Sequence, residues 1–296
     1  MNLFLEEIER IARVFKSVAK QKFVRIFAHY DCDGICSASI LSKALVRENC
    51  DFSLTFLKQL RKEFIDKLEV GDEVLLFLDF GSGQLENLRK FFTNQVFILD
   101  HHLPTKLTHF NLFHLNPLLF DEEDVPTSAI SYFFAKFMDK RNAEMIDVAL
   151  TGIIGDEVDV GWESKKLVGK LIEEGESLGK VRLIRGIRIY GWNKPIHKAL
   201  ANCFNPFIPG ISGSESNAVQ LLSEISIPLK IGDEFRKLRD LNFEEQKRLA
   251  TAIILERLKG REERSEDIFG KICLLSTRPT ELEDAREFAT MLNACG

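Results

Sequence analysis

Three short apolar segments, each ending in acidic or histidine residues, place the strongest limit on the fold of this chain. They are residues 23–28 followed by His29 to Gly34, residues 74–78 followed by Asp79, and residues 95–99 followed by Asp100, His101 and His102. Apolar segments of about four to eight residues between polar or turn-forming residues are typical of buried β-strands. The repeated arrangement predicts strands whose polar residues meet at one edge of a sheet.

The remaining residues up to 160 contain helical patterns and two further apolar segments. Helices are expected at 3–20, 35–46, 58–68, 84–92, 127–140 and 143–154, and strands at 51–57 and 112–115. Thr127 or Ser128 is expected to cap the helix that follows Pro126. Because helical crossovers join parallel strands, the expected fold class is α/β, a mainly parallel sheet flanked by helices with a second, smaller α/β domain.

Shifts in composition predict the domain boundaries. The first domain is expected to span residues 1–180, a basic segment and linker 181–235, and the second domain 236–296. Residues 205–217 are rich in proline and glycine and are the best candidate for the linker. The second domain is expected to contain helices at 242–258 and 280–292 and a strand at 272–276.

The charge and the amino terminus exclude several classes of function. With a net charge of −5, the chain has no general attraction for nucleic acid, so binding a polyanion requires a local basic surface. The first residues are acidic where a signal peptide is basic, and no apolar run reaches about 18 residues, so neither secretion nor membrane insertion is expected. The six cysteines form no Cys-x2-Cys pair, which favours reduced thiols and a cytoplasmic protein.

The strand ends bring acidic and histidine side chains together. Neighbouring strands lie about 4.8 Å apart, so groups at their carboxyl ends share one volume. Several carboxylates in one volume raise one another's pKa unless cations neutralise them. Carboxylates and imidazoles without thiolates fit Mn²⁺ or Mg²⁺, and this many ligands indicates two ions about 3.5 to 4 Å apart, an arrangement that hydrolyses phosphate esters. The cluster consists of His29, Asp31, Asp33, Asp79, Asp100, His101, His102 and Asp156.

Other residues near these motifs have simpler interpretations. Cys32 and Cys36 flank the cluster, but thiolates suit this class of ion poorly, and both are expected to be packing residues. Glu157 and Asp159 are interpreted as a solvated acidic loop, with support of the ligands as the alternative. Expected on the surface or in loops are His109, His114 and His197.

In combination, the motifs resemble those of the DHH phosphoesterase superfamily. The residues that carry the resemblance are His29-Tyr30-Asp31-Cys32-Asp33-Gly34, Asp79 before Phe80-Gly81, Asp100-His101-His102, and Gly155-Asp156. The resemblance covers about residues 20–160, with the motifs in the family's order and at similar spacing. Within the superfamily, the chain is most similar to the RecJ-like exonucleases, particularly the archaeal branch.

The resemblance implies a division of roles within the cluster. It implies two manganese ions with Asp79 as the shared ligand, and Mg²⁺ as a substitute. It also implies that His102 contacts the scissile phosphate and that Asp100 orients the histidines from outside the ligand set, which makes Asp79, Asp100 and His102 the catalytic residues. The implied ligands are His29, Asp31 and Asp79 for one ion and Asp33, Asp79, His101 and Asp156 for the other.

The second domain departs from the family pattern. The resemblance implies a domain of the DHHA1 type with a glycine-rich motif that holds the substrate away from the metals. No Gly-Gly pair occurs between residues 236 and 296. We therefore expect a DHHA1-like domain that is incomplete or divergent.

Three functions follow from these observations. The first is an exonuclease for single-stranded DNA or RNA, supported by the segment 180–198, in which basic residues alternate with Tyr190 and Trp192 as in a groove that tracks a backbone and stacks bases. The second is a phosphoesterase for short oligonucleotides or (cyclic di)nucleotides, which the acidic net charge favours. The third is a non-catalytic replication scaffold, for which the archaeal resemblance suggests GINS as a partner. The candidate contacts with nucleic acid are Arg182, Arg185, Arg188 and Lys194.

Overall fold

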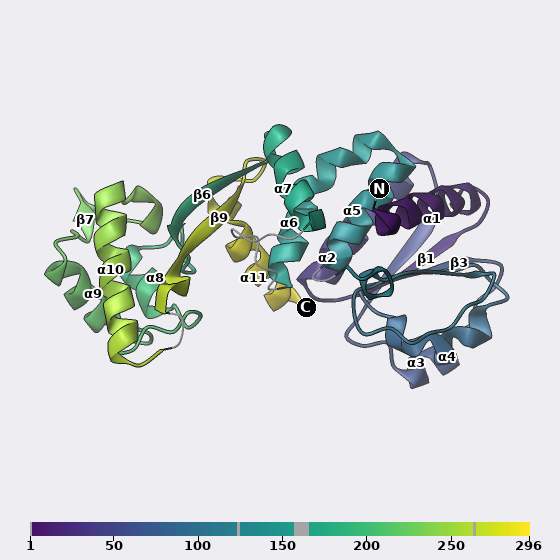
Figure 1. The fold of residues 1–296 in the computed structure, drawn as a ribbon, viewed down its shortest axis with the longest axis horizontal. Helices are drawn as coiled ribbons and strands as arrows, with labels where there is room; N and C mark the ends of the chain where they lie inside the picture. Colours follow the sequence, from purple (N-terminus) through teal and green to yellow (C-terminus); the bar gives the residue numbers. More distant parts are fainter. Residues whose placement is uncertain (1, 123–124, 157–165, 263–264) are drawn as a thin grey trace. The chain divides into compact units, whose positions relative to one another are not determined.

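The chain forms two compact units, each with its own core (Figure 1). The computed structural model describes residues 2–122, 125–156, 166–262 and 265–296. The first unit contains the described residues up to 180 together with 289–296, and the second contains residues 181–288. No helix within the described ranges is long and apolar enough to cross a membrane.

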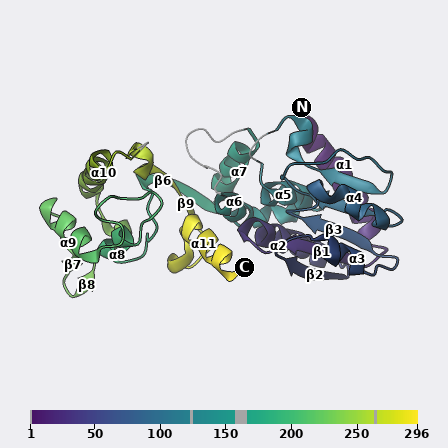
Figure 2. The same cartoon turned by 90° about the horizontal axis from the view of Figure 1, so that it is seen from below.

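The first unit is built on a sheet of five parallel strands in the order β2-β1-β3-β4-β5. In the register, Ala28 lies opposite Leu78 and Leu78 opposite Leu99, so that the polar residues after these strands emerge at one edge. Figure 2 shows the neighbours β3, β1 and β2 side by side. The strands are β1 (Val24–His29), β2 (Phe52–Leu57), β3 (Val74–Leu78), β4 (Val96–Leu99) and β5 (Leu112–Leu115).

Helices cover both faces of this sheet because its central strands β3 and β4 are apolar and buried along their whole length. On one face, the Phe15 ring of α1 packs at 4.9 Å from the Phe97 ring of β4 and at 5.3 Å from the Phe134 ring of α5. On the other face, Phe27 of β1 and Ile65 of α3 belong to one buried cluster. The α/β fold predicted from the sequence is confirmed. The helices of this unit are α1 (Leu3–Ala19), α2 (Cys32–Arg47), α3 (Lys62–Lys67), α4 (Leu85–Leu88), α5 (Thr127–Met138), α6 (Ile146–Gly155) and α7 (Lys166–Ser177), with 3-10 turns η1 (Ser82–Gln84), η2 (Arg89–Phe91), η3 (Pro117–Phe120) and η4 (Lys140–Met145).

The second unit combines a two-stranded antiparallel sheet with helices. Its strands β6 (Val181–Ile187) and β9 (Phe269–Leu275) pair along their whole length. Helix α11 (Ala285–Cys295) begins in this unit, and its residues from 289 belong to the first. The other elements are α8 (Ile196–Ala201), α9 (Glu215–Glu224), α10 (Phe243–Lys259), the short strands β7 (Lys230–Ile231) and β8 (Glu234–Phe235), and the 3-10 turns η5 (Leu238–Asp240), η6 (Ser265–Ile268) and η7 (Thr280–Leu282).

Residues 181–235, which the sequence suggests as a basic segment and linker, share one compact unit with residues 236–288. Ile187, Ile208 and Leu249 all belong to a single buried cluster, and Ile208 is 0% exposed. The prolines and glycines near Ile208 therefore lie in turns of a folded unit. Turn-forming residues mark both linkers and tight turns, and burial distinguishes the two.

Candidate functional site

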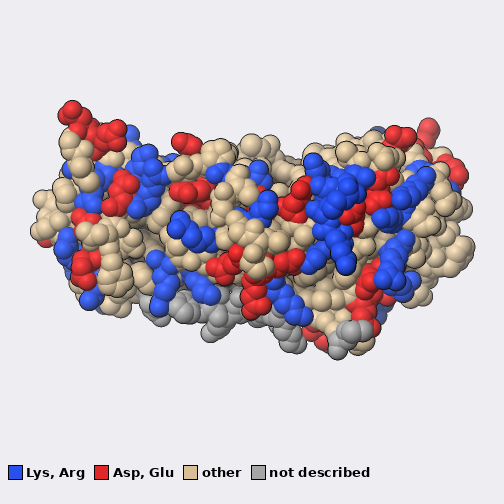
Figure 3. Space-filling view, turned by 90° about the horizontal axis from the view of Figure 1, so that it is seen from above, with Lys and Arg blue, Asp and Glu red and all other residues tan. Residues whose placement is uncertain are grey.

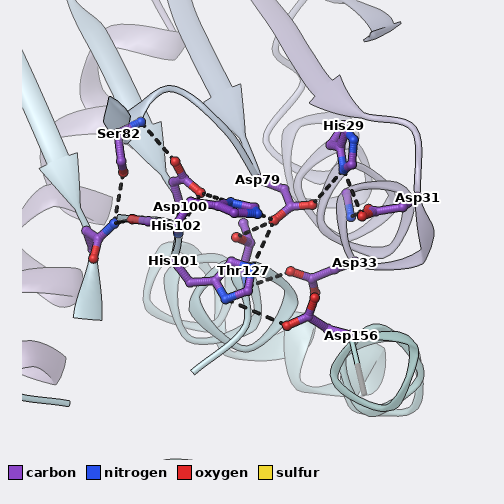
Figure 4. Close-up of polar contacts among 12 residues, drawn as sticks. His29, Asp31, Asp33, Asp79, Ser82, Asp100, His101, His102, Thr127 and Asp156 are labelled. Carbon is purple, nitrogen blue, oxygen red and sulfur yellow. Dashed lines mark hydrogen bonds and ion pairs between the residues drawn. The ribbon is translucent and has the colours of Figure 1, made fainter. Parts of the chain in front are cut away.

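Asp79 lies at the centre of the site, directly after β3. Its φ of 66° lies in the left-handed region, which residues other than glycine rarely adopt. The side chain is buried, with Oδ2 at 3.3 Å from Nδ1 of His29 and Oδ1 at 3.4 Å from Nε2 of His101. One carboxylate thus faces histidines that follow two different strands (Figure 4).

The first group around Asp79 contains His29 and Asp31. His29 ends β1, and Asp31 caps α2 by accepting the N–H of Gly34 at 3.0 Å. The candidate ligand atoms of His29, Asp31 and Asp79 lie within 4.8 Å of one another. Nε2 of His29 lies 3.2 Å from the carbonyl oxygen of Lys58, which can only accept, so Nε2 carries the proton in the neutral ring. This leaves the lone pair on Nδ1, the nitrogen that faces the two carboxylates.

The second group contains Asp79 with His101 and His102, whose candidate ligand atoms also lie within 4.8 Å of one another. The other ring nitrogen of His101, Nδ1, lies 3.7 Å from Oδ2 of Asp156. Asp156 is the residue directly after α6, so this helix end contributes to the same cluster as the strand ends (Figure 4).

Asp100 holds His102 in place. Its Oδ1 accepts both the backbone N–H of His102 at 3.1 Å and Nδ1–H of the same ring at 2.7 Å. Since Nδ1 is engaged in this bond, Nε2 is the nitrogen that remains for another group. Asp100 is 0% exposed, whereas the His102 side chain is 57% exposed, so the ring is accessible from outside the cluster.

A network of three residues that the sequence did not point to supports this pair. Ser82 donates its backbone N–H to Oδ2 of Asp100 at 2.8 Å, and its hydroxyl lies 2.7 Å from Nε2 of His114. Asn116 donates from Nδ2 to the Ser82 hydroxyl at 2.9 Å and to the carbonyl of His102 at 2.7 Å. Burial lowers the pKa of His114 to about 4, so the ring is neutral and Nε2 accepts from Ser82.

The expectation that His114 lies on the surface or in a loop is therefore wrong: it belongs to β5, is only partly exposed, and bonds to Ser82. His197 is also buried, at 6% exposed, because α8 packs into the core of the second unit. Neither position could be predicted from residue type, because histidine occurs both in protein interiors and on surfaces.

Asp33 lies in the first turn of α2 but caps a different helix. Its two carboxylate oxygens accept the N–H groups of Thr127 at 2.7 Å and Ser128 at 2.9 Å. The capping residue of α5 is Pro126, which offers no side-chain acceptor, so the expectation that Thr127 or Ser128 caps this helix is wrong. The Thr127 hydroxyl instead donates to Oδ1 of Asp79 at 3.1 Å.

The carboxyl groups of the cluster have unusual proton affinities. Burial, reinforced by the charge of Asp79, raises the pKa of Asp33 well above its ordinary value. Burial likewise raises the pKa of Asp156 to about 6. For Asp79 burial acts in the same direction, but the facing imidazoles of His101 and His29 outweigh it and lower its pKa below the usual range. Negative charge is thus concentrated on Asp79.

The histidines respond to this negative charge. The carboxylates of Asp31 and Asp79, which face Nδ1 of His29, raise the pKa of this histidine to about 10. Burial acts to lower the pKa of His101, but Asp79 and the other acidic neighbours raise it to about 9. The hydrogen bond with Asp100 raises the pKa of His102. Each of these shifts reflects the acidic side chains that surround the three histidines.

The residues present fit a pair of divalent metal ions. Within the described part of the chain, Nδ1 of His29, Nε2 of His101 and Oδ2 of Asp79 are buried without a hydrogen-bond partner. A buried polar atom without a partner costs about 1–3 kcal/mol, so three of them around one carboxylate point to a ligand that they jointly hold. Carboxylate and imidazole donors are those of Mg²⁺, Mn²⁺ and similar ions, and Asp79 belongs to both groups of candidate ligands.

The basic residues predicted to contact nucleic acid lie in the second unit. Arg182 and Arg185 are three residues apart on β6, so they lie on opposite faces of the strand. Nζ of Lys194 lies 4.0 Å from the centre of the Tyr190 ring. Trp192 is 7% exposed, so its ring is not available for stacking on bases. On the face shown in Figure 3, basic side chains are interspersed with acidic ones.

Two further expectations concern the surroundings of the cluster. Cys32 and Cys36 are 0% and 2% exposed and pack with Ala289, which confirms their role as packing residues. Glu157 and Asp159 lie outside the described residues.

Known protein families match both units. Residues 23–153 match the model of the DHH family N-terminal domain, and residues 189–267 match the model of the DHH-CID domain. The chain belongs to the DHH superfamily. The first match contains every candidate ligand except Asp156. The second match is to a DHH-CID domain, not to the expected DHHA1 type, and it begins at residue 189, within the segment predicted as a linker.

One relative is similar over most of the chain. An uncharacterized protein of Methanocaldococcus jannaschii is 32% identical over 267 residues, which is 85% of this chain. The chain spans 58% of the length of that relative.

Solved structures show a similar fold. CDC45 from Entamoeba histolytica superposes with a TM-score of 0.69 at 15% identity, covering 96% of this chain and 62% of that protein. RecJ from Thermus thermophilus in complex with Mn²⁺ gives a TM-score of 0.48 at 20% identity, covering 86% of this chain and 38% of RecJ. At 15% identity, the likeness to CDC45 is one of fold.

Proposed function

We propose that this DHH superfamily chain is a phosphodiesterase that hydrolyses single-stranded DNA or RNA from an end, with two Mn²⁺ ions or Mg²⁺ in their place. The observation that carries the proposal is the position of Asp79, whose two oxygens face His29 on one side and His101 on the other. A carboxylate shared by two ligand groups is the central element of a two-metal phosphoesterase site.

The ligands divide between the two ions. His29, Asp31 and Asp79 would hold one ion, and Asp79, Asp33, His101 and Asp156 the other. Such ions polarise phosphoryl oxygens and lower the pKa of the attacking water. The raised pKa values of Asp33 and Asp156 support their inclusion, since burial and, to a smaller extent, the charge of Asp79 disfavour their ionised forms, which a bound cation would stabilise.

His102 is proposed to contact the scissile phosphate rather than an ion. Its Nδ1 is engaged by Asp100 at 2.7 Å, which fixes the ring and leaves Nε2 to donate a hydrogen bond to a phosphate oxygen. Its side-chain exposure of 57% keeps it within reach of a substrate. Asp100 acts through His102 and does not itself contact the substrate.

A phosphoesterase for short oligonucleotides or (cyclic di)nucleotides is the second candidate. The net charge of −5 and the mixed charges on the face in Figure 3 favour a small substrate over a long polyanion. The candidate contacts Arg182, Arg185, Arg188 and Lys194 favour a longer strand. Both candidates use the same cluster and differ in substrate length.

A non-catalytic replication scaffold with GINS as a partner is the third candidate. The likeness to E. histolytica CDC45 over 96% of the chain favours it as a matter of fold. Against it stands the complete set of acidic and histidine residues around Asp79, which a scaffold does not need.

The deciding experiment is hydrolysis of end-labelled single strands of DNA and RNA, compared with a dinucleotide, in the presence of Mn²⁺. We expect shortening of the long strands from one end, and loss of at least about 10³-fold in rate for Asp79→Ala and Asp79→Asn. Asparagine tolerates the left-handed backbone at this position, so D79N separates chemistry from folding. Asp66→Asn, on the exposed surface of α3, is the control.

Each alternative result has a clear meaning. A strong preference for the dinucleotide would assign the second function. Absence of hydrolysis of either substrate by the unmodified chain, together with binding of GINS, would assign the third. Activity retained in D79N would refute the two-metal arrangement itself.

A further inference from the structure

The last turns of α11, which belong to the first unit, present a small apolar stripe to α2. Ala289 and Leu292 are three residues apart and lie on one side of the helix with Asn293. Ala289 is 2% exposed and packs with Cys32 and Cys36 of α2, and Leu292 packs against the same cluster. This stripe directs the Asn293 side chain at the start of α2.

Asn293 forms a hydrogen bond to each of two helix ends. Its Oδ1 accepts the backbone N–H of Cys32, the first residue of α2, at 2.7 Å. Its Nδ2 donates to the carbonyl of Gly155, the last residue of α6, at 3.2 Å. Helix ends leave such N–H and C=O groups without partners in the helix itself, so one amide group satisfies both.

The two helix ends are the ones that carry candidate ligands. Asp33 lies in the first turn of α2, one residue after Cys32, and Asp156 directly follows Gly155. The amide of Asn293 therefore bonds to the residue directly before each carboxylate in the chain.

At Gly152 and Gly155, helix α6 lies so close to α2 that no side chain of α6 separates the two helices. A Cβ atom on Gly155 would lie 2.4 Å from Sγ of Cys32, and one on Gly152 would lie 2.9 Å from Cβ of Cys36. Backbone contact alone does not prevent sliding of one helix along the other. A hydrogen bond from Asn293 to each helix end prevents this sliding, because any shift lengthens one of the two bonds.

We infer that Asn293 is a positioning residue for the second ion of the proposed two-metal site. It fixes the end of α6 against the start of α2 and thereby sets the separation between Asp156 and Asp33. The inference rests on the proposed function for its consequence, and on the two hydrogen bonds for its geometry. The ligands of the other ion, His29, Asp31 and Asp79, depend on the sheet and on the cap of α2.

The test is Mn²⁺ binding to the metal-free full chain, followed by electron paramagnetic resonance, with hydrogen exchange as a second readout. For Asn293→Ala we expect one of the two Mn²⁺ sites to weaken by about 10- to 100-fold, as for other groups that orient ligands, and the other to stay within about twofold. The Cys32 amide should exchange faster in the metal-free protein. Asn293→Asp keeps the acceptor for the Cys32 amide and loses the donor to Gly155. In this variant the Cys32 amide should therefore exchange slowly, as in the unmodified chain, while the second Mn²⁺ ion should bind as weakly as in Asn293→Ala.

Met291→Ala is the matched control, since Met291 is 45% exposed on the same helix and should leave both readouts unchanged. The inference is overturned if N293A lowers the Mn²⁺ affinity of both sites equally, or if the exchange rate of the Cys32 amide does not change. If the unmodified chain bound no Mn²⁺, the proposed function would fail. Faster exchange of the Cys32 amide in N293A than in M291A would still establish that Asn293 links α2 and α6.

Discussion

The Thr127 hydroxyl donates a hydrogen bond of 3.1 Å to Oδ1 of Asp79, while its backbone N–H binds Asp33. One residue at the start of α5 therefore contacts two candidate metal ligands that are 46 positions apart in the sequence, at 33 and 79. The hydroxyl bond restrains the carboxylate that the two ligand groups share.

Thr127→Val should consequently weaken metal binding without unfolding the protein. Valine keeps the shape and the backbone N–H but loses the hydroxyl, so we expect Mn²⁺ affinity to fall by about tenfold. Titration of the metal-free protein with Mn²⁺ measures this change. Thr127→Ser keeps the hydroxyl and should bind as the unmodified chain does; equal loss in both variants would contradict the role given to this bond.

Asn116→Ala should slow hydrolysis while leaving Mn²⁺ affinity nearly unchanged. The substitution removes the donors to the Ser82 hydroxyl and the His102 carbonyl, so the loop that presents His102 loses its anchor. Buried groups left without partners should also lower the free energy of unfolding by about 1–3 kcal/mol each. Turnover rate, Mn²⁺ affinity and urea unfolding are the three measurements.

Asn111→Ala is the comparison for this prediction, because Asn111 donates a similar hydrogen bond to the Phe92 carbonyl away from the cluster. It should cost stability without slowing turnover. If N116A and N111A reduced turnover equally, the Asn116 network would have no specific part in presenting His102.

Divalent metal should stabilise the first unit. A ligand that binds only the folded state adds about 4 kcal/mol at a thousandfold excess over its dissociation constant. We expect thermal unfolding to shift upward on addition of Mn²⁺ and to return on addition of EDTA. In D79N the shift should largely disappear, and a shift that persisted there would place the bound metal elsewhere.

The buried Asp284 in the second unit gives a pH dependence of defined sign. It is 5% exposed, and burial together with the charge of Glu287 raises its pKa to about 6. An acid whose pKa is higher in the folded chain binds more protons when folded, so stability is lost as the pH rises through this value. The associated loss between about pH 4 and pH 7 is about 1–3 kcal/mol.

Asp284→Asn removes this titration and keeps an acceptor for the Arg286 N–H, which lies at 2.8 Å. Urea unfolding of both chains across this pH range should therefore show stability that falls less steeply in D284N. Parallel pH profiles would mean that Asp284 stays ionised throughout.

The strands of the first unit could be predicted from the sequence within one residue at each end, for example 95–99 against Val96–Leu99. For the central strands β3 and β4 the reason is that buried parallel strands are short, continuously apolar and bounded by polar residues, a pattern with few alternatives. The residues that follow these strands then meet because the register of the sheet aligns the carboxyl ends of β1, β3 and β4. The cluster around Asp79 follows from the same reasoning.

Contacts made by single polar residues could not be predicted in this way. Ser82, Asn116 and Asn293 carry no periodic signal, and their partners lie far away in sequence. The cap of α5 was misassigned for the same reason: Asp33, which accepts its N–H groups, precedes the helix by more than 90 positions. Local capping rules consider only neighbours in the chain.

In the second unit, prediction from the sequence failed for a different reason. Helices α8 and α9 lie in a region where proline, glycine and basic residues dominate the local pattern, and neither was expected. Their burial depends on Leu249 and Ile253 of α10, which follow later in the chain. Tertiary packing outweighs local propensity there.

The capping of α5 by Asp33 has a consequence for the electric field at the cluster. The N-terminus of α2 carries Asp31 and Asp33, and the N-terminus of α5 points its N–H groups at Asp33. Each helix end contributes roughly half of a positive elementary charge. The backbone therefore supplies about one unit of positive charge that neither pH nor side-chain substitution can remove, and the acidic residues start from a partly neutralised field before any ion arrives.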